Sequence, residues 1–357
     1  MEKSLLQNNS RAVANWVFIG VFMLLVQVIL GGITRLTGSG LSITEWDVIT
    51  GFVPPLNSQQ WVTEFEKYKQ TPQYNLLHSD FTLPDFKFIF FWEWFHRFWA
   101  RMVGVVFIVG FIYLVWKRKM KQEMIRPLMI LFLLGALQGA VGWIMVASGL
   151  TGDAIYVKPT KLAVHFVLAL GLICYAFWFA LQLLVAQKEI IRNTSLRKWS
   201  WAIIIILFFQ LLFGALMAGH KAANVAPTWP AINGDWFPES LFKQSPLLMN
   251  FIDNKITVQF VHRLLAYLLF ILTIIWTVKA YRSPVTTISF KKRRWLPFFM
   301  VFIQIVLGII TVLSSTQIVA NKWGIFEWFA QFHQITGMLF LLSMIYMLYL
   351  VRSEKRL

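Results

Sequence analysis

The sequence predicts an all-α integral membrane protein whose eight transmembrane helices form two pseudo-symmetric four-helix bundles. Three observations support this. The 357 residues are 58% hydrophobic and only 14% charged, against about 25% charged residues in a typical soluble chain. The apolar residues form continuous runs long enough to cross a bilayer, which takes about 20 residues. One polar pattern recurs in both halves. Continuous runs also exclude a β-barrel, whose strands alternate.

Hydropathy places the eight spans, and the basic residues orient them. The spans are expected at residues 14–33, 87–116, 127–147, 161–186, 199–219, 256–280, 296–315 and 328–351. Of the 33 Lys and Arg residues, 20 lie in the termini and in the loops 117–126, 187–198 and 279–294, whereas the longer opposite loops hold ten. By the positive-inside rule, both termini are cytoplasmic and the long loops 34–86 and 220–255 face outward.

Charge and cysteine content restrict the partners of the protein. The net charge of +17 reflects basic clusters between apolar runs, so we expect lipid and no nucleic acid as the partner of these clusters. The lone cysteine, Cys174, excludes an internal disulfide. The N-terminal segment has neither a cleavage site after its apolar run nor the composition of a transit peptide. We therefore expect a retained first span in a bacterial inner membrane.

A four-fold repeat of polar residues organises the spans. Each odd-numbered span carries a Gln-x-x-x-Gly pattern near its outer end, and each even-numbered span carries one histidine soon after its outer start. The glutamines are Gln27, Gln138, Gln210 and Gln304, and the histidines are His96, His165, His262 and His333. His96 and His262 are 166 residues apart, as are Gln138 and Gln304. This spacing predicts an N-terminal half, 1–198, and a duplicated C-terminal half, 199–357.

Four histidines at one membrane depth favour a haem in each half. Ionisable groups in a bilayer are costly and usually face the bundle interior. Zinc fits poorly, because no two of these histidines lie one helical turn apart. Haem iron instead takes axial imidazoles from opposite faces, and hence from different helices. We therefore pair His96 with His165, and His262 with His333.

Basic and acidic residues accompany the histidines. Arg97 and Arg101 in the first half and Arg263 in the second are expected to bind haem propionates, because arginine pairs with carboxylates in bidentate fashion. Glu93 precedes the first histidine by three residues, where the second half has Gln259. Both positions share the helical face of the histidine, so this asymmetry predicts a chemical role for Glu93 in the first site alone. An ion pair between Glu93 and Arg97 is the simpler alternative.

Several segments resemble the haem A synthases over nearly the whole chain. They are residues 31–42 (GGITRLTGSGLS), 45–46 (EW), 51–55 (GFVPP) and 86–97, together with the three later histidine helices. The resemblance implies oxidation of the C8 methyl group of haem O to the formyl group of haem A, through a hydroxymethyl intermediate, for cytochrome oxidase. It also implies that His96 and His165 hold the substrate haem, that His262 and His333 bind haem b iron, and that Glu93 is the essential acid.

The same resemblance suggests partners. These are haem O synthase, cytochrome oxidase subunit I and an electron acceptor. Some family members have a cysteine pair in the first outer loop. This chain has none there, so thiol chemistry in that loop is not expected.

Two other functions fit part of the pattern. A di-haem b cytochrome that exchanges electrons with quinone would explain four histidines but neither Glu93 nor the long first loop. A proton-coupled transporter would use His and Glu without haem.

Overall fold

Helices account for the regular structure of the protein. The computed structural model describes residues 2–45, 50–319 and 322–352. Within these ranges it contains α-helices and short 3₁₀ turns but no β-strand, and eight helices are long and apolar enough to cross a membrane. The predicted all-α, eight-span membrane fold is therefore confirmed. Residues 46–49, which include part of the motif at 45–46, lie outside the described residues.

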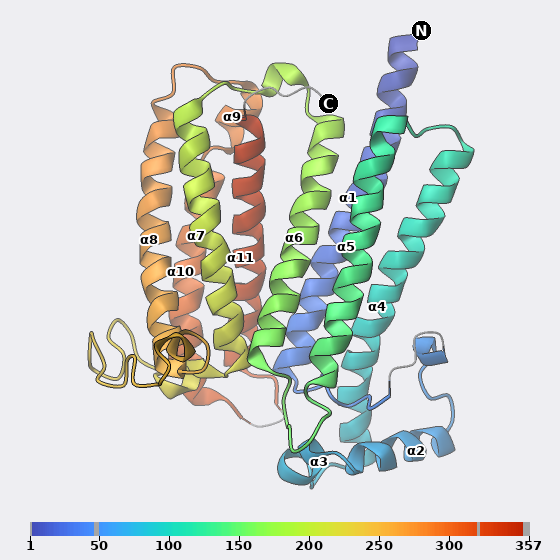
Figure 1. Cartoon of the computed structure of the whole chain (residues 1–357), viewed down its shortest axis with the longest axis vertical. Coiled ribbons are helices and arrows are strands. Elements are labelled where there is room, and N and C mark those ends of the chain that lie inside the picture. The colour runs from blue at the N-terminus through green and yellow to red at the C-terminus, as the bar shows by residue number, and fades with distance from the viewer. Residues whose placement is uncertain (1, 46–49, 320–321, 353–357) are drawn as a thin grey trace.

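The eight spanning helices coincide with the eight predicted spans and extend beyond most of them. They are α1 (Glu2–Leu36), α4 (Leu83–Trp116), α5 (Gln122–Ala147), α6 (Pro159–Leu184), α7 (Thr194–Gly219), α8 (Lys255–Tyr281), α10 (Leu296–Ser314) and α11 (Ile325–Leu350). Three shorter helices, α2 (Ser58–Lys69), α3 (Pro72–Leu77) and α9 (Ile288–Arg293), lie in the connections. The start of α1 and the end of α11 lie at the same end of the bundle (Figure 1).

Local capping fixes where the histidine helices begin. Thr82 and Asp85 form a capping box at the start of α4, with Pro84 in the first turn. The Asn254 side chain accepts hydrogen bonds from the backbone N–H groups of Ile256 and Thr257 at the start of α8. Such caps satisfy the first N–H groups of a helix. The caps of α4 and α8 thus fix the depth at which His96 and His262 enter the bundle.

Helix pairing is similar in the two halves except in one place. In the first half α1 packs against α4 and α6, and α5 packs against α6; in the second half α7 packs against α8 and α11, and α10 packs against α11. In addition α8 packs closely against α10, whereas α4 and α5, which occupy the equivalent positions, form no comparable pair. Figure 1 shows α4 at the outer edge of the molecule. The two-fold pseudo-symmetry itself stays a prediction.

The two halves meet along α1, α6, α7 and α11. Polar side chains on α11 bind the backbone of α1: the Gln331 amide donates to Ile29 O at 3.2 Å, and the Gln334 amide donates to Val28 O at 2.8 Å. Gly32 leaves room for both amides, because a Cβ there would clash with the side chains of Gln331 and Gln334. Hydrogen bonds to backbone carbonyls therefore hold the halves together in a medium that offers no water.

A cap formed by α2 and α3 covers the end of the first half that lies opposite the start of α1 (Figure 1). At its centre the Tyr68 hydroxyl lies 2.6 Å from His78 Nδ1 and donates to Gln73 Oε1 at 3.0 Å. Burial raises the pKa of the Tyr68 hydroxyl, so it stays protonated and can donate. The Gln73 amide then reaches Gly38 O and Ile155 O. This chain of contacts fastens the cap to two other outer loops.

Candidate functional site

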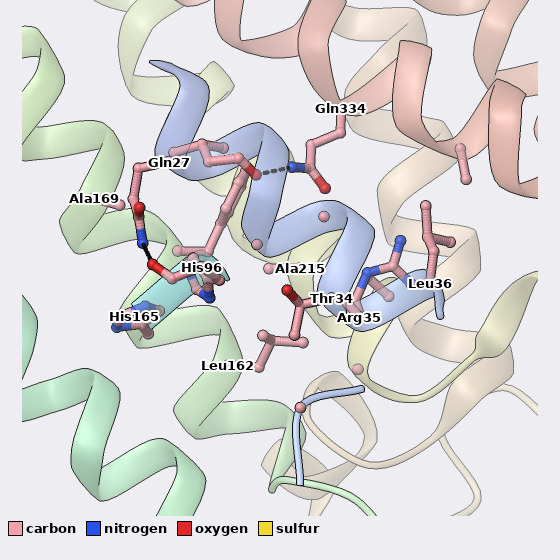
Figure 2. A pocket seen from close by; sticks show the side chains of 18 of the residues that line it. Gln27, Thr34, Arg35, Leu36, His96, Leu162, His165, Ala169, Ala215 and Gln334 are labelled. Atoms are coloured by element: carbon pink, nitrogen blue, oxygen red, sulfur yellow. Dashed lines mark hydrogen bonds between the residues drawn. The ribbon is translucent and has the colours of Figure 1, made fainter. Parts of the chain in front are cut away.

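A continuous cavity of about 1550 Å³ runs through the bundle and reaches both halves. All four repeat histidines line it, and Figure 2 shows His96 and His165 side by side on its wall in the first half. A typical small-molecule site has a volume of about 300–1,000 Å³. The cavity therefore exceeds what one ligand of ordinary size would fill.

The glycines of the Gln-x-x-x-Gly repeat make room for the four histidine rings. A Cβ on Gly142 would lie 2.8 Å from the His165 ring, and one on Gly308 would lie 2.9 Å from the His333 ring. The corresponding distances are 3.2 Å for Gly214 and His262 and 3.5 Å for Gly31 and His96. The repeat thus pairs the neighbouring helices α1 with α4, α5 with α6, α7 with α8 and α10 with α11.

Each glutamine of the repeat binds the histidine of its paired helix. The amides of Gln27 and Gln138 donate to the backbone oxygens of His96 and His165 at 3.2 and 3.1 Å. Those of Gln210 and Gln304 lie 3.3 Å from Nε2 of the facing histidine. Within the described part of the chain, Oε1 of all four glutamines is buried without a hydrogen-bond partner. Buried polar atoms of this kind normally have a hydrogen-bond partner. Each glutamine therefore has a free acceptor for the N–H group of a ligand-bound imidazole.

Filling the space beside one histidine tests this geometry. We expect Gly308→Leu to push the His333 ring out of place and to cost about 1–3 kcal/mol of stability, because core overpacking has that magnitude. Ligand binding in the second half should be lost while the first half is retained. The control is Gly171→Leu, since a Cβ at Gly171 meets no atom within 4 Å. Absorption spectra of the two purified variants give the comparison. Unchanged spectra for Gly308→Leu would contradict the geometry.

Glu93 lies at the centre of a dense polar network at the wall of the first half. Its side chain is only 2% exposed. Oε2 accepts hydrogen bonds from the backbone N–H and hydroxyl of Ser42, both at 2.7 Å, and from the Ile43 N–H at 2.9 Å. Oε1 forms an ion pair with Arg97 at 2.6 Å. The ion pair considered from the sequence is therefore present, and the network ties the glycine-rich segment at 31–42 to α4.

The second half has a different network at the equivalent position. The Gln259 amide donates to Ala226 O at 3.0 Å, whereas Glu93 accepts from backbone N–H groups. Both residues anchor an outer loop to the histidine helix, but with opposite hydrogen-bond polarity. The first half therefore has a buried carboxylate where the second half has a neutral amide. This difference is a local consequence of one substitution between the repeats.

The two arginines that follow the histidines hold loop backbone. Arg97 donates to Ile43 O and Glu45 O at 3.3 and 3.2 Å in addition to its ion pair with Glu93. Arg263 donates to the carbonyls of residues 226, 228, 230 and 231, the shortest contact being 2.7 Å to Thr228 O. Both line the cavity, as does Arg101. Propionate binding by the three arginines stays a prediction, to which the structure adds loop anchoring by Arg97 and Arg263.

Loop anchoring makes the effect of an arginine substitution local. We expect Arg263→Leu to free the loop at 226–231, because hydrogen bonds from a charged group contribute about 1.5–3 kcal/mol each. Proteolytic cleavage in that loop should rise, and ligand should be lost from the second half only. Arg97→Leu should show the same behaviour in the first half. Equal loss from both halves in either variant would indicate a general folding defect.

The structure places two further histidines and one further arginine. His78 and His220 lie outside the four-fold repeat. His78 is 5% exposed, stacks on Phe81 and lines the cavity. His220 follows α7 and its Nε2 lies 2.6 Å from Ile252 O. Arg35 also lines the cavity, and Figure 2 shows it beside Thr34. Arg35 was not singled out from the sequence; its charge at the end of a span is the signal that could have identified it.

The second histidine pair has the spacing of two ligands to one metal atom. The ring centres of His262 and His333 are 6.3 Å apart. Two imidazoles bound at about 2 Å on either side of an iron atom place their ring centres about 6 Å apart. Within the described ranges, no group of three or more His, Cys, Asp and Glu side chains gathers to hold a metal ion. An ion held by this pair would therefore need further ligands from outside the protein, as a porphyrin provides.

The fold and the site define a class of protein: a multi-pass membrane protein with two pairs of histidines in one cavity of its helix bundle. Comparison with known sequences gives the family. The chain belongs to the cytochrome oxidase assembly protein family COX15-CtaA, whose profile matches residues 14–345.

Curated relatives match over most of their length. The chain is 41% identical over 310 residues to a protein of Bradyrhizobium diazoefficiens, covering 86% of this chain and 85% of the relative. It is 38% identical over 347 residues to one of Flavobacterium psychrophilum, covering 96% and 98%. It is 42% identical over 310 residues to one of Rhodopseudomonas palustris strain HaA2, covering 86% and 84%. All three relatives are named heme A synthase.

Proposed function

We propose that this protein is a haem A synthase, an oxidoreductase that converts the C8 methyl group of haem O to the formyl group of haem A. The observation that carries the proposal is the opposed histidine pairs in the cavity of a chain that aligns with relatives of that name over 85% or more of its length. The overall change consumes one water and releases four protons and four electrons to an acceptor. A hydroxymethyl group is the intermediate.

The two histidine pairs have different roles in this proposal. His96 and His165 hold the iron of the substrate haem O, and His262 and His333 hold haem b. The spacing of the second pair and the unsatisfied glutamine acceptors beside the rings support the fit. When bound, haem b supplies one-electron redox chemistry. Arg97, Arg101 and Arg263 are the candidates for the propionates, since all three line the cavity.

Glu93 is suited to hold a fixed negative charge beside the substrate. One oxygen accepts three hydrogen bonds and the other pairs with Arg97, so the carboxylate is held in one position and orientation. We therefore infer that Glu93 stabilises positive charge that develops at the C8 methyl carbon. Preorganised charge of this kind does not have to reorient during the reaction. Ser42 is the positioning residue for this carboxylate.

The location follows from the charges and from the relatives. We infer a bacterial inner membrane with both termini in the cytoplasm. The loops rich in Lys and Arg lie on the same side as the termini, and the relatives named above are bacterial. The histidines lie in the first halves of α4, α6, α8 and α11, which supports haem sites toward the outer side. Haem O synthase would supply the substrate, and cytochrome oxidase subunit I would receive the product.

Extraction of the bound haems tests the proposal against its alternatives. The purified protein is analysed by its pyridine haemochrome spectrum, and its extracted haems are separated by chromatography. Haem O or haem A beside haem B supports the synthase. Haem B alone would favour a di-haem b cytochrome that exchanges electrons with quinone, and absence of haem would favour a proton-coupled transporter.

A further inference from the structure

The first half differs from the second at three glycines, to which the proposed function assigns no role. Gly104 on α4 and Gly135 and Gly139 on α5 all line the cavity. A Cβ on any of them would meet no atom within 4 Å, and all three positions are exposed. The cavity wall is therefore open between α4 and α5, in the part of the bundle that faces lipid.

The repeat identifies what closes the same wall in the second half. With the offset of 166 residues, the three glycines correspond to Phe270, Val301 and Ile305. The Phe270 ring stacks on Phe298 with ring centres 6.2 Å apart, which joins α8 to α10. Val301 is 2% exposed. Larger side chains thus occupy all three positions in the second half, and at Phe270 and Val301 they pack between the helices.

The opening has a defined inner boundary. Phe107 on α4 and Phe132 on α5 stack with ring centres 6.2 Å apart. Gly104 lies one turn before Phe107, and Gly135 one turn after Phe132. The opening therefore extends from the histidine pair to this aromatic contact. Its borders are apolar, with Ile108, Phe132 and Ala136 among the cavity residues.

We propose that this opening, lined by Gly104, Gly135 and Gly139, is a subsite for the isoprenoid chain of the substrate haem. The inference rests on the proposed function, because it assigns the substrate to the first half. Haem O differs from haem B in carrying a long hydrocarbon chain, which a closed bundle could not accommodate beside the macrocycle. The isoprenoid chain leaves the cavity between α4 and α5 and continues into the lipid. The resident haem b has no such chain, and its half is closed.

The test makes the first half copy the second. The triple variant Gly104→Phe, Gly135→Val, Gly139→Ile is purified as the full chain and placed in lipid nanodiscs. Haem O or haem B is then added, and binding to the first half is measured as the change in absorption that is absent in a His96→Ala background. We expect binding of haem O to weaken at least ten-fold and binding of haem B to change less than two-fold.

The controls separate failure of the subsite from failure of the proposed function. Gly171→Ile adds a similar side chain on an exposed face outside the cavity and should bind both haems normally. Gly139→Ile alone serves if the triple variant does not fold. The subsite would be overturned if the triple variant lost binding of both haems equally. It would also be overturned if the variant bound haem O normally, whatever its oligomeric state. If the unsubstituted protein showed no His96-dependent binding of haem O, the proposed function itself would fail, and the subsite with it.

Discussion

Glu93→Gln should abolish the formation of haem A while leaving the protein inserted and its second half loaded. The substitution removes the negative charge and places an NH₂ group against either the N–H donors of Ser42 and Ile43 or the Arg97 guanidinium. Loss of a preorganised charge of this kind typically lowers a rate by a factor of about 10²–10³. Haem O or its hydroxymethyl form should accumulate. Chromatography of haems extracted from cells that produce the variant measures the outcome.

A matched substitution separates the charge from its structural contacts. Ser42→Ala removes the hydroxyl that donates to Glu93 Oε2 but leaves both backbone donors and the carboxylate. We expect this variant to keep most of its haem A formation. If Ser42→Ala were as inactive as Glu93→Gln, the carboxylate would serve to anchor the loop. Near-normal haem A in Glu93→Gln would also reduce Glu93 to a structural partner of Arg97.

His262→Ala should remove the low-spin haem b spectrum entirely, and His333→Ala should do the same. One axial ligand of a bis-histidine site is lost in each case, and a small side chain remains beside Gly214 or Gly308. Membrane insertion should be unaffected, because the capping contacts at the start of α8 are untouched. Absorption spectra of the purified, reduced protein measure the loss. His220→Ala is the control, since His220 bonds to Ile252 O and is not among the cavity residues.

The corresponding substitutions in the first half make the assignment specific. His96→Ala and His165→Ala should keep the haem b spectrum and lose binding of haem O. If His262→Ala retained a full and unshifted spectrum, the resident haem would have to be bound elsewhere. Loss of haem b in His96→Ala would instead show that the two sites are not separate.

The fold could be predicted because each span carries its own signal. An apolar run of about 20 residues identifies a spanning helix without knowledge of its neighbours. The four histidines and their glutamines were visible for a similar reason, since the pattern recurs at fixed spacing. The predicted ends of the helices were less accurate. Helix α4 begins at Leu83, four residues before the predicted span, because Thr82 and Asp85 cap it there.

The partners of the site residues could not be predicted, because they come from distant segments. Glu93 binds Ser42, 51 positions away, and only the folded first outer loop brings them together. His78 carried no repeat or motif, and its burial depends on the packing of α2 and α3 against α4. The open wall at Gly104 required knowledge of the relative positions of α4 and α5.

The cap fastened by Tyr68, Gln73 and His78 also affects how the enzyme meets its substrate. Because the cap covers the end of the first half that lies opposite the start of α1, we expect haem O to arrive by lateral diffusion within the bilayer. The relevant concentration is then the mole fraction of substrate in the membrane. Adding inert phospholipid at constant bulk concentrations of enzyme and haem should slow the reaction by surface dilution, while adding buffer should not.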